Sequence, residues 1–187
     1  MTRLRDPLGP HDHVLGRPRA PAELVEYGDY ECAFCARAHL EMVEVLRRVG
    51  GDLRYAFRHF PLVDLHPHAM LAAQAAEAAA EQGRFWPMHS MLFENQHALA
   101  TEDLMVYAGS LGLDTHRFAR DLRAPGRLPK VQNDLRTGAR SGVRGTPTFF
   151  LDALRVEEGW DADTLTTAIR ELTRRRPPPP RQGAPGR

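Results

Sequence analysis

The chain has two cysteines, and they form a single Cys-x-x-Cys motif at Cys32 and Cys35. The motif follows a short apolar run over residues 22–27 that predicts a strand, and it opens a segment with helical spacing. A thiol pair at a strand-to-helix junction can close and reopen a disulfide, because the free amides of the helix favour the thiolate of the first sulfur. We expect Cys32, the more exposed sulfur, to attack a substrate, and the buried Cys35 to resolve the mixed disulfide.

Length and composition restrict the classes of function open to the chain. Its 187 residues suffice for one domain with a core, and its net charge of +1 indicates neither nucleic acid nor an anionic membrane as a partner. No segment reaches the roughly 20 apolar residues that a membrane span requires. The first residues lead into no apolar signal segment, so we expect a cytoplasmic protein. In a reducing cytosol, a lone cysteine pair is typical of a catalytic or metal-binding site rather than of a structural disulfide.

The order of predicted elements indicates one α/β domain with an all-helical insertion. Residues 1–20, rich in Pro, Gly, His and Arg, predict an extended arm, and the Pro- and Arg-rich residues 174–187 predict a disordered tail. Residues 21–173 form the domain, with the insertion at about residues 66–142. A strand, a helix and a second strand in succession suggest a parallel unit. The predicted strands are 22–27, 53–58, 147–151 and 154–156, and the predicted helices are 32–49, 69–82, 85–97, 101–111, 114–122, 129–139 and 161–172.

Two further residues favour a redox role for the cysteine pair. Glu26 is a carboxylate inside the first apolar strand, where it is costly unless it has a task or a partner. It either exchanges a proton with the resolving thiol, or it is turned to solvent or satisfied by a salt bridge. Pro147, which follows Gly145 and Thr146 at the start of the third predicted strand, is a candidate for a cis peptide bond facing the cysteines. The alternative is an ordinary trans proline at a strand edge.

Taken together, Cys32-Ala33-Phe34-Cys35 and Gly145-Thr146-Pro147 resemble the thioredoxin superfamily, and the long helical insertion is similar to its DsbA-type branch of thiol-disulfide oxidoreductases. Segments 25–32, 57–62, 83–89 and 161–165 resemble further parts of that branch, so the resemblance covers roughly residues 21–172. It implies a thioredoxin-like α/β fold with a helical insertion between the second strand and the cis-proline strand. It also implies disulfide exchange with protein or low-molecular-weight thiol substrates, without a cofactor.

The resemblance assigns roles to individual residues. The first cysteine becomes the nucleophile and the second the resolving thiol, and the acid in the first strand matches a buried acid of the family. The residue before the cis-proline is expected to contact the substrate backbone. The predicted catalytic residues are Cys32, Cys35 and Glu26, the predicted substrate-binding residues are Ala33, Phe34, Thr146 and Pro147, and no metal ligand is predicted.

The sequence also departs from the family pattern. The two residues between the cysteines supply neither the Pro nor the His of strong oxidants, and Glu31 adds a negative charge that should raise the pKa of Cys32. We therefore predict a less oxidising pair than that of the periplasmic enzymes, and a Cys32 pKa below about 4.5 contradicts this prediction. Asp152 and Ala153 stand where family members often have Asn-Gly. Because Ala resists a positive φ, we expect that hairpin to use a turn other than type I′.

Three other functions compete with disulfide exchange. A zinc or copper site could combine both cysteines with His39 and one of His59, His66 or His68, although His39 lies nearly two helical turns from the first cysteine. A non-catalytic interaction module with the same fold is the second. The third is a kappa-class glutathione transferase, which uses a serine nucleophile, so two intact cysteines argue against it.

Overall fold

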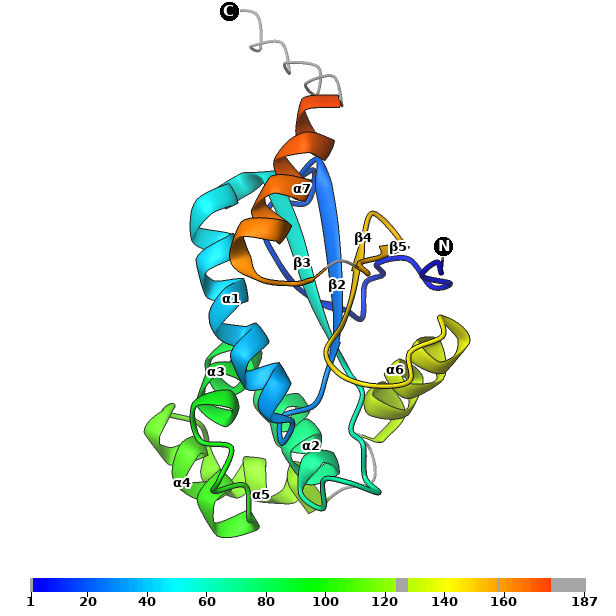
Figure 1. Ribbon diagram of the computed structural model, residues 1–187. Coiled ribbons are helices and arrows are strands. Elements are labelled where there is room, and N and C mark those ends of the chain that lie inside the picture. The colour runs from blue at the N-terminus through cyan, green and yellow to red at the C-terminus, as the bar shows by residue number, and fades with distance from the viewer. Residues whose placement is uncertain (1, 124–127, 158, 176–187) are drawn as a thin grey trace, which may run out of the picture.

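The computed structural model describes residues 2–123, 128–157 and 159–175. These residues form a five-stranded mixed sheet in the order β1-β3-β2-β4-β5, with helices on both faces (Figure 1). The strands are β1 (His13–Leu15), β2 (Ala22–Gly28), β3 (Leu53–His59), β4 (Thr148–Leu151) and β5 (Leu154–Arg155). The helices are α1 (Ala33–Val49), a short 3₁₀ turn (Gly50–Asp52), α2 (Ala69–Ala80), α3 (Phe85–Glu94), α4 (Thr101–Ser110), α5 (Thr115–Arg123), α6 (Leu128–Arg140) and α7 (Ala162–Arg175).

The centre of the sheet is the parallel pair β2 and β3, joined through α1. Strand β4 runs antiparallel to β2 on its other side, so Glu26 lies in register with Phe57 on one neighbour and Phe149 on the other. A central strand is covered on both faces, which explains why β2 and β3 are almost entirely buried, including the polar residues Glu26, Arg58 and His59. The parallel unit predicted from the sequence is confirmed.

The two faces of the sheet bury different residues because side chains alternate along each strand. Leu24 belongs to the large core under α1 and α7, whereas Val25 and Tyr27 belong to a smaller core on the opposite face. Figure 1 shows α1 and α7 on one side of the sheet and α6 on the other. Alternation places Glu26 on the same face as Leu24, which is the face covered by the cysteine-bearing helix α1.

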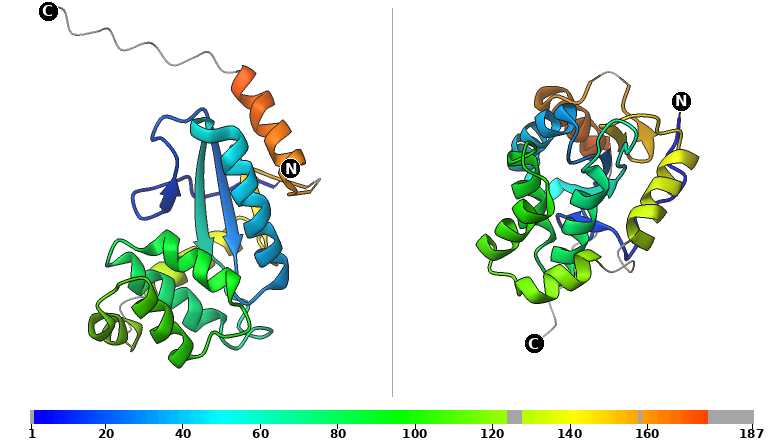
Figure 2. Two further views of the ribbon diagram at one scale, coloured as in Figure 1. Left: turned by 90° about the vertical axis from the view of Figure 1, so that its left-hand side faces the viewer. Right: turned by 90° about the horizontal axis from the view of Figure 1, so that it is seen from below.

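The insertion gathers at one end of the sheet, where α2, α3, α4 and α5 pack together and α6 continues onto the second face (Figure 2). The alanines of α2 are buried on nearly every side, because this helix contacts α3, α4, α5 and α6. Small side chains let these neighbours approach closely. The predicted α/β fold, with a helical insertion between the second parallel strand and the strand after Pro147, is confirmed.

The first 20 residues are not simply an extended arm, because they contain β1, which pairs antiparallel with β3. Arg58 of β3 reaches back to this segment and forms a two-pronged ion pair with Asp12, at 2.8 and 2.9 Å. Its guanidinium also donates to the backbone carbonyls of Asp6 and Pro7. A strand of three residues is too short to show a two-residue period, so the sequence pattern did not reveal it.

The hairpin between β4 and β5 corrects another expectation. Asp152 and Ala153 have φ values of 48° and 65°, the two positive angles of a type I′ turn. The prediction of another turn was therefore wrong. Asp152 is held in place because its backbone N–H donates to the Glu23 carbonyl at 2.8 Å, while its Oδ1 accepts from the Glu23 N–H at 2.9 Å.

At the C-terminus, α7 extends to Arg175, further than the sequence pattern predicted, because charged residues in an exposed last turn need no apolar contact. Most of the tail that was predicted to be disordered, residues 176–187, lies outside the described residues.

Candidate redox site

The cysteine pair lies at the N-terminus of α1, with Cys32 as its N-cap residue. The Cys32 carbonyl accepts the N–H groups of Cys35 at 3.0 Å and Ala36 at 3.1 Å, which fixes the first turn. Cys35 is completely buried, and both thiols are free. Cys32 is only 5% exposed, less than the sequence analysis predicted, and the Thr146 carbonyl lies 3.5 Å from its sulfur. The segment before β4 therefore closes over the first cysteine.

The two thiols have opposite acid strengths. A hydrogen bond from the Cys35 thiol lowers the pKa of Cys32 most, and although burial opposes it, further hydrogen bonds bring that pKa to about 5. Burial raises the pKa of Cys35 far above its usual value, and its hydrogen bond to Cys32 and the charge of Glu26 act in the same direction. At neutral pH the first sulfur is thus a thiolate and the second a thiol, which is the division of roles that disulfide exchange requires.

The rim of the site carries the four residues predicted to contact a substrate. The Thr146–Pro147 peptide bond is cis, and both residues are partly exposed beside Cys32. Ala33 is exposed, and the Phe34 side chain is 64% exposed, large for an aromatic ring. The structure thus brings all four residues to the surface around the first cysteine.

Glu26 lies in the interior of the sheet, so the solvent-facing and salt-bridge interpretations were wrong. Its Oε2 accepts a hydrogen bond of 2.6 Å from the Tyr55 hydroxyl, while Oε1 is buried without a partner among the described residues. Burial raises the pKa of Glu26 to about 8; the Tyr55 bond opposes this shift and the Cys32 charge adds to it. The carboxyl group is therefore mostly protonated at neutral pH and can exchange a proton close to the cysteines.

Gln96, in the loop after α3, was not predicted to belong to the site. Its side-chain Nε2 donates to the carbonyls of Tyr30 at 2.7 Å and Cys32 at 2.9 Å. This contact ties the helical insertion to the backbone that carries the first cysteine. A single glutamine in a loop has no distinguishing pattern in sequence, so only the fold reveals its position.

Asp29 organises the loop before the cysteines and was also missed. Its N–H lies 3.4 Å from the Cys35 sulfur, and its carboxylate accepts from the N–H groups of Glu31 and Leu62, each at 2.8 Å. The same carboxylate lies 2.8 Å from Nδ1 of His66. Burial alone lowers the pKa of His66, but the bond to Asp29 and the nearby negative charges, Cys32 among them, raise it overall. A positive charge next to the pair is thereby favoured.

Glu31, which was predicted to raise the pKa of Cys32, does not decide that pKa. Its carboxylate accepts from the His68 N–H at 2.6 Å and lies 3.1 Å from Nδ1 of His68. The pKa of the neighbouring Cys32 is lowered, not raised. The hydrogen bonds to the Cys32 sulfur outweigh a carboxylate that is directed to another partner.

The histidines proposed for a cysteine metal site do not converge on the two sulfurs. Each has its own neighbours elsewhere: His39 packs against His89 and Phe93, His59 bonds Glu77, His66 bonds Asp29 and His68 bonds Glu31. Among the described residues, the group with metal-ligand geometry contains no cysteine.

Comparison with known proteins identifies the class to which this fold and site belong. The profile of the family described as Thioredoxin matches residues 9–171, and the chain belongs to this family. Its fold is that of the DsbA-type thiol-disulfide oxidoreductases within it.

Solved structures with a similar fold support this assignment of the fold. The chain is similar to a thioredoxin-like oxidoreductase from Silicibacter pomeroyi DSS-3, with a TM-score of 0.79, 27% identity, and coverage of 90% of this chain and 95% of the other. BdbD from Bacillus subtilis, in its oxidised form, has a TM-score of 0.79 at 23% identity, over 88% of this chain and 94% of its own. The alpha-DsbA1 protein from Wolbachia pipientis has a TM-score of 0.76 at 23% identity, over 92% of this chain and 95% of its own. The last two show likeness of fold alone.

Curated relatives are longer proteins. The Na(+)/H(+) antiporter NhaA of Herminiimonas arsenicoxydans is 45% identical over 92% of this chain and 27% of its own length. Na(+)/H(+) antiporter NhaA 1 of Mycolicibacterium gilvum is 44% identical over 89% of this chain and 28% of its own. The chain thus spans little more than a quarter of these relatives. Within residues 2–123, 128–157 and 159–175, no helix combines the length and apolarity of a membrane span.

Proposed function

We propose that the chain is a protein thiol-disulfide oxidoreductase that works through Cys32 and Cys35. The observation that carries the proposal is the contrast between the two thiols, a Cys32 with a pKa of about 5 beside a buried Cys35 with a strongly raised pKa. A structural cysteine pair has no need of this asymmetry, whereas a nucleophile and a resolving thiol do.

The positions of Cys32, Cys35 and Glu26 define the steps of disulfide exchange. In the oxidising direction, a substrate thiolate attacks the Cys32 sulfur of the Cys32–Cys35 disulfide, and the S–S bond breaks with its electron pair on Cys35. Glu26 gives its proton to the Cys35 thiolate, directly or through water. A second substrate thiolate then attacks the substrate sulfur of the mixed disulfide and releases Cys32 as a thiolate. The substrate loses two electrons and the enzyme gains them; in the reducing direction each step reverses.

The site's surface favours an extended protein segment as substrate. The cis Thr146–Pro147 bond lies at a strand start beside Cys32, and exposed Phe34 offers an apolar contact next to the same sulfur. Backbone groups of Thr146 pair with the substrate chain, and Ala33 leaves room for it. Low-molecular-weight thiols use the same sulfur with fewer contacts.

We also propose a moderate oxidising strength. A Cys32 pKa of about 5 lies between the values of about 3.5 for the strong oxidant DsbA and about 7 for thioredoxin. Greater thiolate stability favours the reduced form and makes the disulfide more oxidising. We propose a cytoplasmic location for this enzyme. In a reducing compartment, a lone cysteine pair serves an exchange site rather than a structural disulfide. The name Na(+)/H(+) antiporter describes the whole of each longer relative. The function proposed here concerns only the thioredoxin-like region that this chain shares with them.

The test is catalysed disulfide exchange on a peptide that carries two thiols, with glutathione disulfide as the oxidant. The full chain should accelerate formation of the peptide disulfide, and Cys32→Ser should abolish the acceleration. Cys35→Ser should instead accumulate a mixed disulfide between Cys32 and the peptide, visible by mass. An unchanged rate in Cys32→Ser would overturn the proposal and favour a non-catalytic interaction module.

A further inference from the structure

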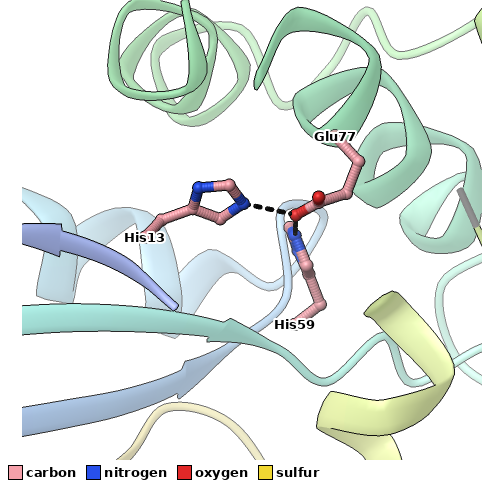
Figure 3. Close-up of side chains that lie close together, drawn as sticks. All are labelled: His13, His59 and Glu77. Carbon is pink, nitrogen blue, oxygen red and sulfur yellow. Dashed lines mark hydrogen bonds and ion pairs between the residues drawn. The ribbon is translucent and has the colours of Figure 1, made fainter. Parts of the chain in front are cut away.

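Two histidines and a glutamate converge at a second place in the fold, away from the cysteines. His13 comes from β1, His59 ends β3, and Glu77 lies on α2, as Figure 3 shows. Both imidazole Nε2 atoms lie 2.7 Å from the same carboxylate oxygen, Oε1 of Glu77. One ligand atom from each residue lies within 4.8 Å of the other two. Three segments far apart in the sequence thus direct three metal-ligating atoms to one point.

From these contacts we propose that His13, His59 and Glu77 bind a divalent transition-metal ion, with zinc as the best match. Two imidazole nitrogens and one carboxylate oxygen form a three-ligand zinc set that leaves a fourth position for water. Tetrahedral bonds of about 2.1 Å put neighbouring ligand atoms roughly 3.4 Å apart. The Glu77 oxygen, now 2.7 Å from each nitrogen, therefore needs to withdraw by less than about 1 Å.

Glu77 is buried and contacts both histidines through one carboxylate oxygen. Burial by itself raises its pKa, but the hydrogen bonds and charges of His13 and His59 outweigh burial and hold the pKa well below its usual range. A cation bound between the three side chains would place a positive charge beside the buried Glu77 side chain.

The surroundings allow an ion to enter and a water molecule to complete its coordination. A cavity of about 430 Å³ is lined by His13 and Glu77 together with Asp12 and Lys130. The positive charge of Lys130 is paired with Asp134, because its ammonium group lies 2.6 Å from each carboxylate oxygen of that residue. This pairing weakens the repulsion between Lys130 and a bound cation. His13 stacks on Phe85 with ring centroids 3.5 Å apart, which orients its Nε2 toward Glu77. His59 is buried, whereas His13 and Glu77 line the cavity, so the site opens toward it.

Zinc at this position would join β1 to the sheet and to the first helix of the insertion. Such a site differs from the Cys/His site considered from sequence, because it shares only His59 with it and uses no sulfur. Sequence spacing alone predicts no metal here, since the ligands stand at positions 13, 59 and 77 without a short repeat.

The test is zinc binding by the full-length Cys32→Ser/Cys35→Ser variant, in which thiols do not compete. We expect one zinc ion per chain by competition with a chromophoric chelator, and Co²⁺ should give the visible bands of a four-coordinate nitrogen and oxygen site. His13→Gln and Glu77→Gln, added separately, should each weaken zinc binding at least about 10-fold. His11→Gln, a matched change in the same cavity wall, should leave it unaltered.

The proposal is overturned if the double serine variant binds no zinc, or if His13→Gln and Glu77→Gln bind it as tightly as their parent. Far-ultraviolet circular dichroism of each variant before titration separates loss of a ligand from loss of the fold. If Glu77→Gln does not fold, the partly exposed His13 gives the deciding comparison with His11. Disulfide exchange is measured separately on the chain with both cysteines, so failure of one proposal leaves the other standing.

Discussion

The Tyr55 hydroxyl donates a 2.6 Å hydrogen bond to the carboxyl group of Glu26, on the face of the sheet that α1 covers. Two strands, β2 and β3, thereby place a protonated acid and its donor under the cysteine-bearing helix. The pKa of Glu26, raised to about 8, brings its proton into the range of neutral pH.

Glu26→Gln should change both catalysis and the pH dependence of stability. Without an acid that exchanges a proton with Cys35, the step that forms or releases the Cys35 thiolate should slow about 10-fold or more at pH 7. Stopped-flow measurement with a dithiol peptide separates this step from the attack on Cys32. Glu31→Gln is the matched control, because its carboxylate is directed to His68. Equal slowing by both variants would contradict a proton-exchange role for Glu26.

The same raised pKa predicts a stability profile. The folded state binds the Glu26 proton more tightly than the unfolded state, in which the pKa is about 4.5. The stability of the reduced wild-type protein should therefore contain a contribution that falls as pH rises from about 4.5 to 8, by a few kcal/mol in total. The acidic Cys32 adds a contribution of opposite sign in both proteins, so the Glu26 contribution is the difference between the wild-type and Glu26→Gln profiles measured by urea unfolding. This difference should fall as pH rises, and Glu31→Gln should follow the wild type. Parallel profiles for wild type and Glu26→Gln would refute the shift.

The hydrogen bond from Cys35 is the largest contribution to the acidity of Cys32. Cys35→Ala, which removes the donor, should raise the pKa of Cys32 by at least about one unit, whereas Cys35→Ser, which keeps a hydroxyl donor, should raise it less. Thiolate absorbance at 240 nm, or the pH dependence of alkylation, gives this pKa. We expect a midpoint near 5 in the wild type. A lower pKa in Cys35→Ala than in Cys35→Ser would reverse the assignment.

Gln96 should matter more than its loop position indicates. Gln96→Ala leaves the carbonyls of Tyr30 and Cys32 without this donor and should cost about 1–3 kcal/mol of unfolding free energy. Gln82→Ala removes a similar pair of bonds, to the exposed backbone of Asp114, where water replaces them, so it should cost less. Chemical denaturation of the reduced proteins measures both. A larger loss in Gln82→Ala would contradict the positioning role of Gln96.

Ala153 occupies a positive φ that glycine adopts without strain. Ala153→Gly should raise the unfolding free energy by up to about 1 kcal/mol, because relief of the left-handed conformation outweighs the entropy that glycine adds to the unfolded chain. The matched change Ala80→Gly, at the end of helix α2, should lower stability instead. Thermal unfolding of both variants gives the two signs, and destabilisation by both would contradict the turn assignment.

The sequence predicted the parts of this protein that leave a local pattern. The Cys-x-x-Cys pair, the apolar strand around Glu26 and the helical spacing of α1 and α7 each lie within one short segment, and each element was found within a few residues of its predicted bounds. The fold class followed from their order.

What the sequence did not reveal depends on contacts between distant segments. Strand β1 is too short to show a two-residue period, and Gln96 reaches the backbone of Cys32 from the loop after α3. Asp29 is close to Cys32 in sequence, but its contacts with Leu62 and His66 depend on the fold. A lowered pKa of Cys32 was predicted from the helix N-terminus, with the charge of Glu31 opposing it, whereas hydrogen bonds with Cys35 and Thr146 are the largest causes that lower it. The type I′ turn at Asp152 is likewise fixed by Glu23, which is remote in the chain.

The central claim is that Cys32 and Cys35 exchange disulfides, and redox equilibration of the full chain against glutathione tests it most directly. After acid quenching and alkylation of free thiols, mass spectrometry gives the fraction with an intramolecular disulfide. We predict a two-electron equilibrium with a potential between about −270 mV, the value for thioredoxin, and about −120 mV, the value for DsbA. Cys32→Ser and Cys35→Ser should form no intramolecular disulfide. If the wild-type chain forms none at any glutathione ratio, the account of this site is wrong.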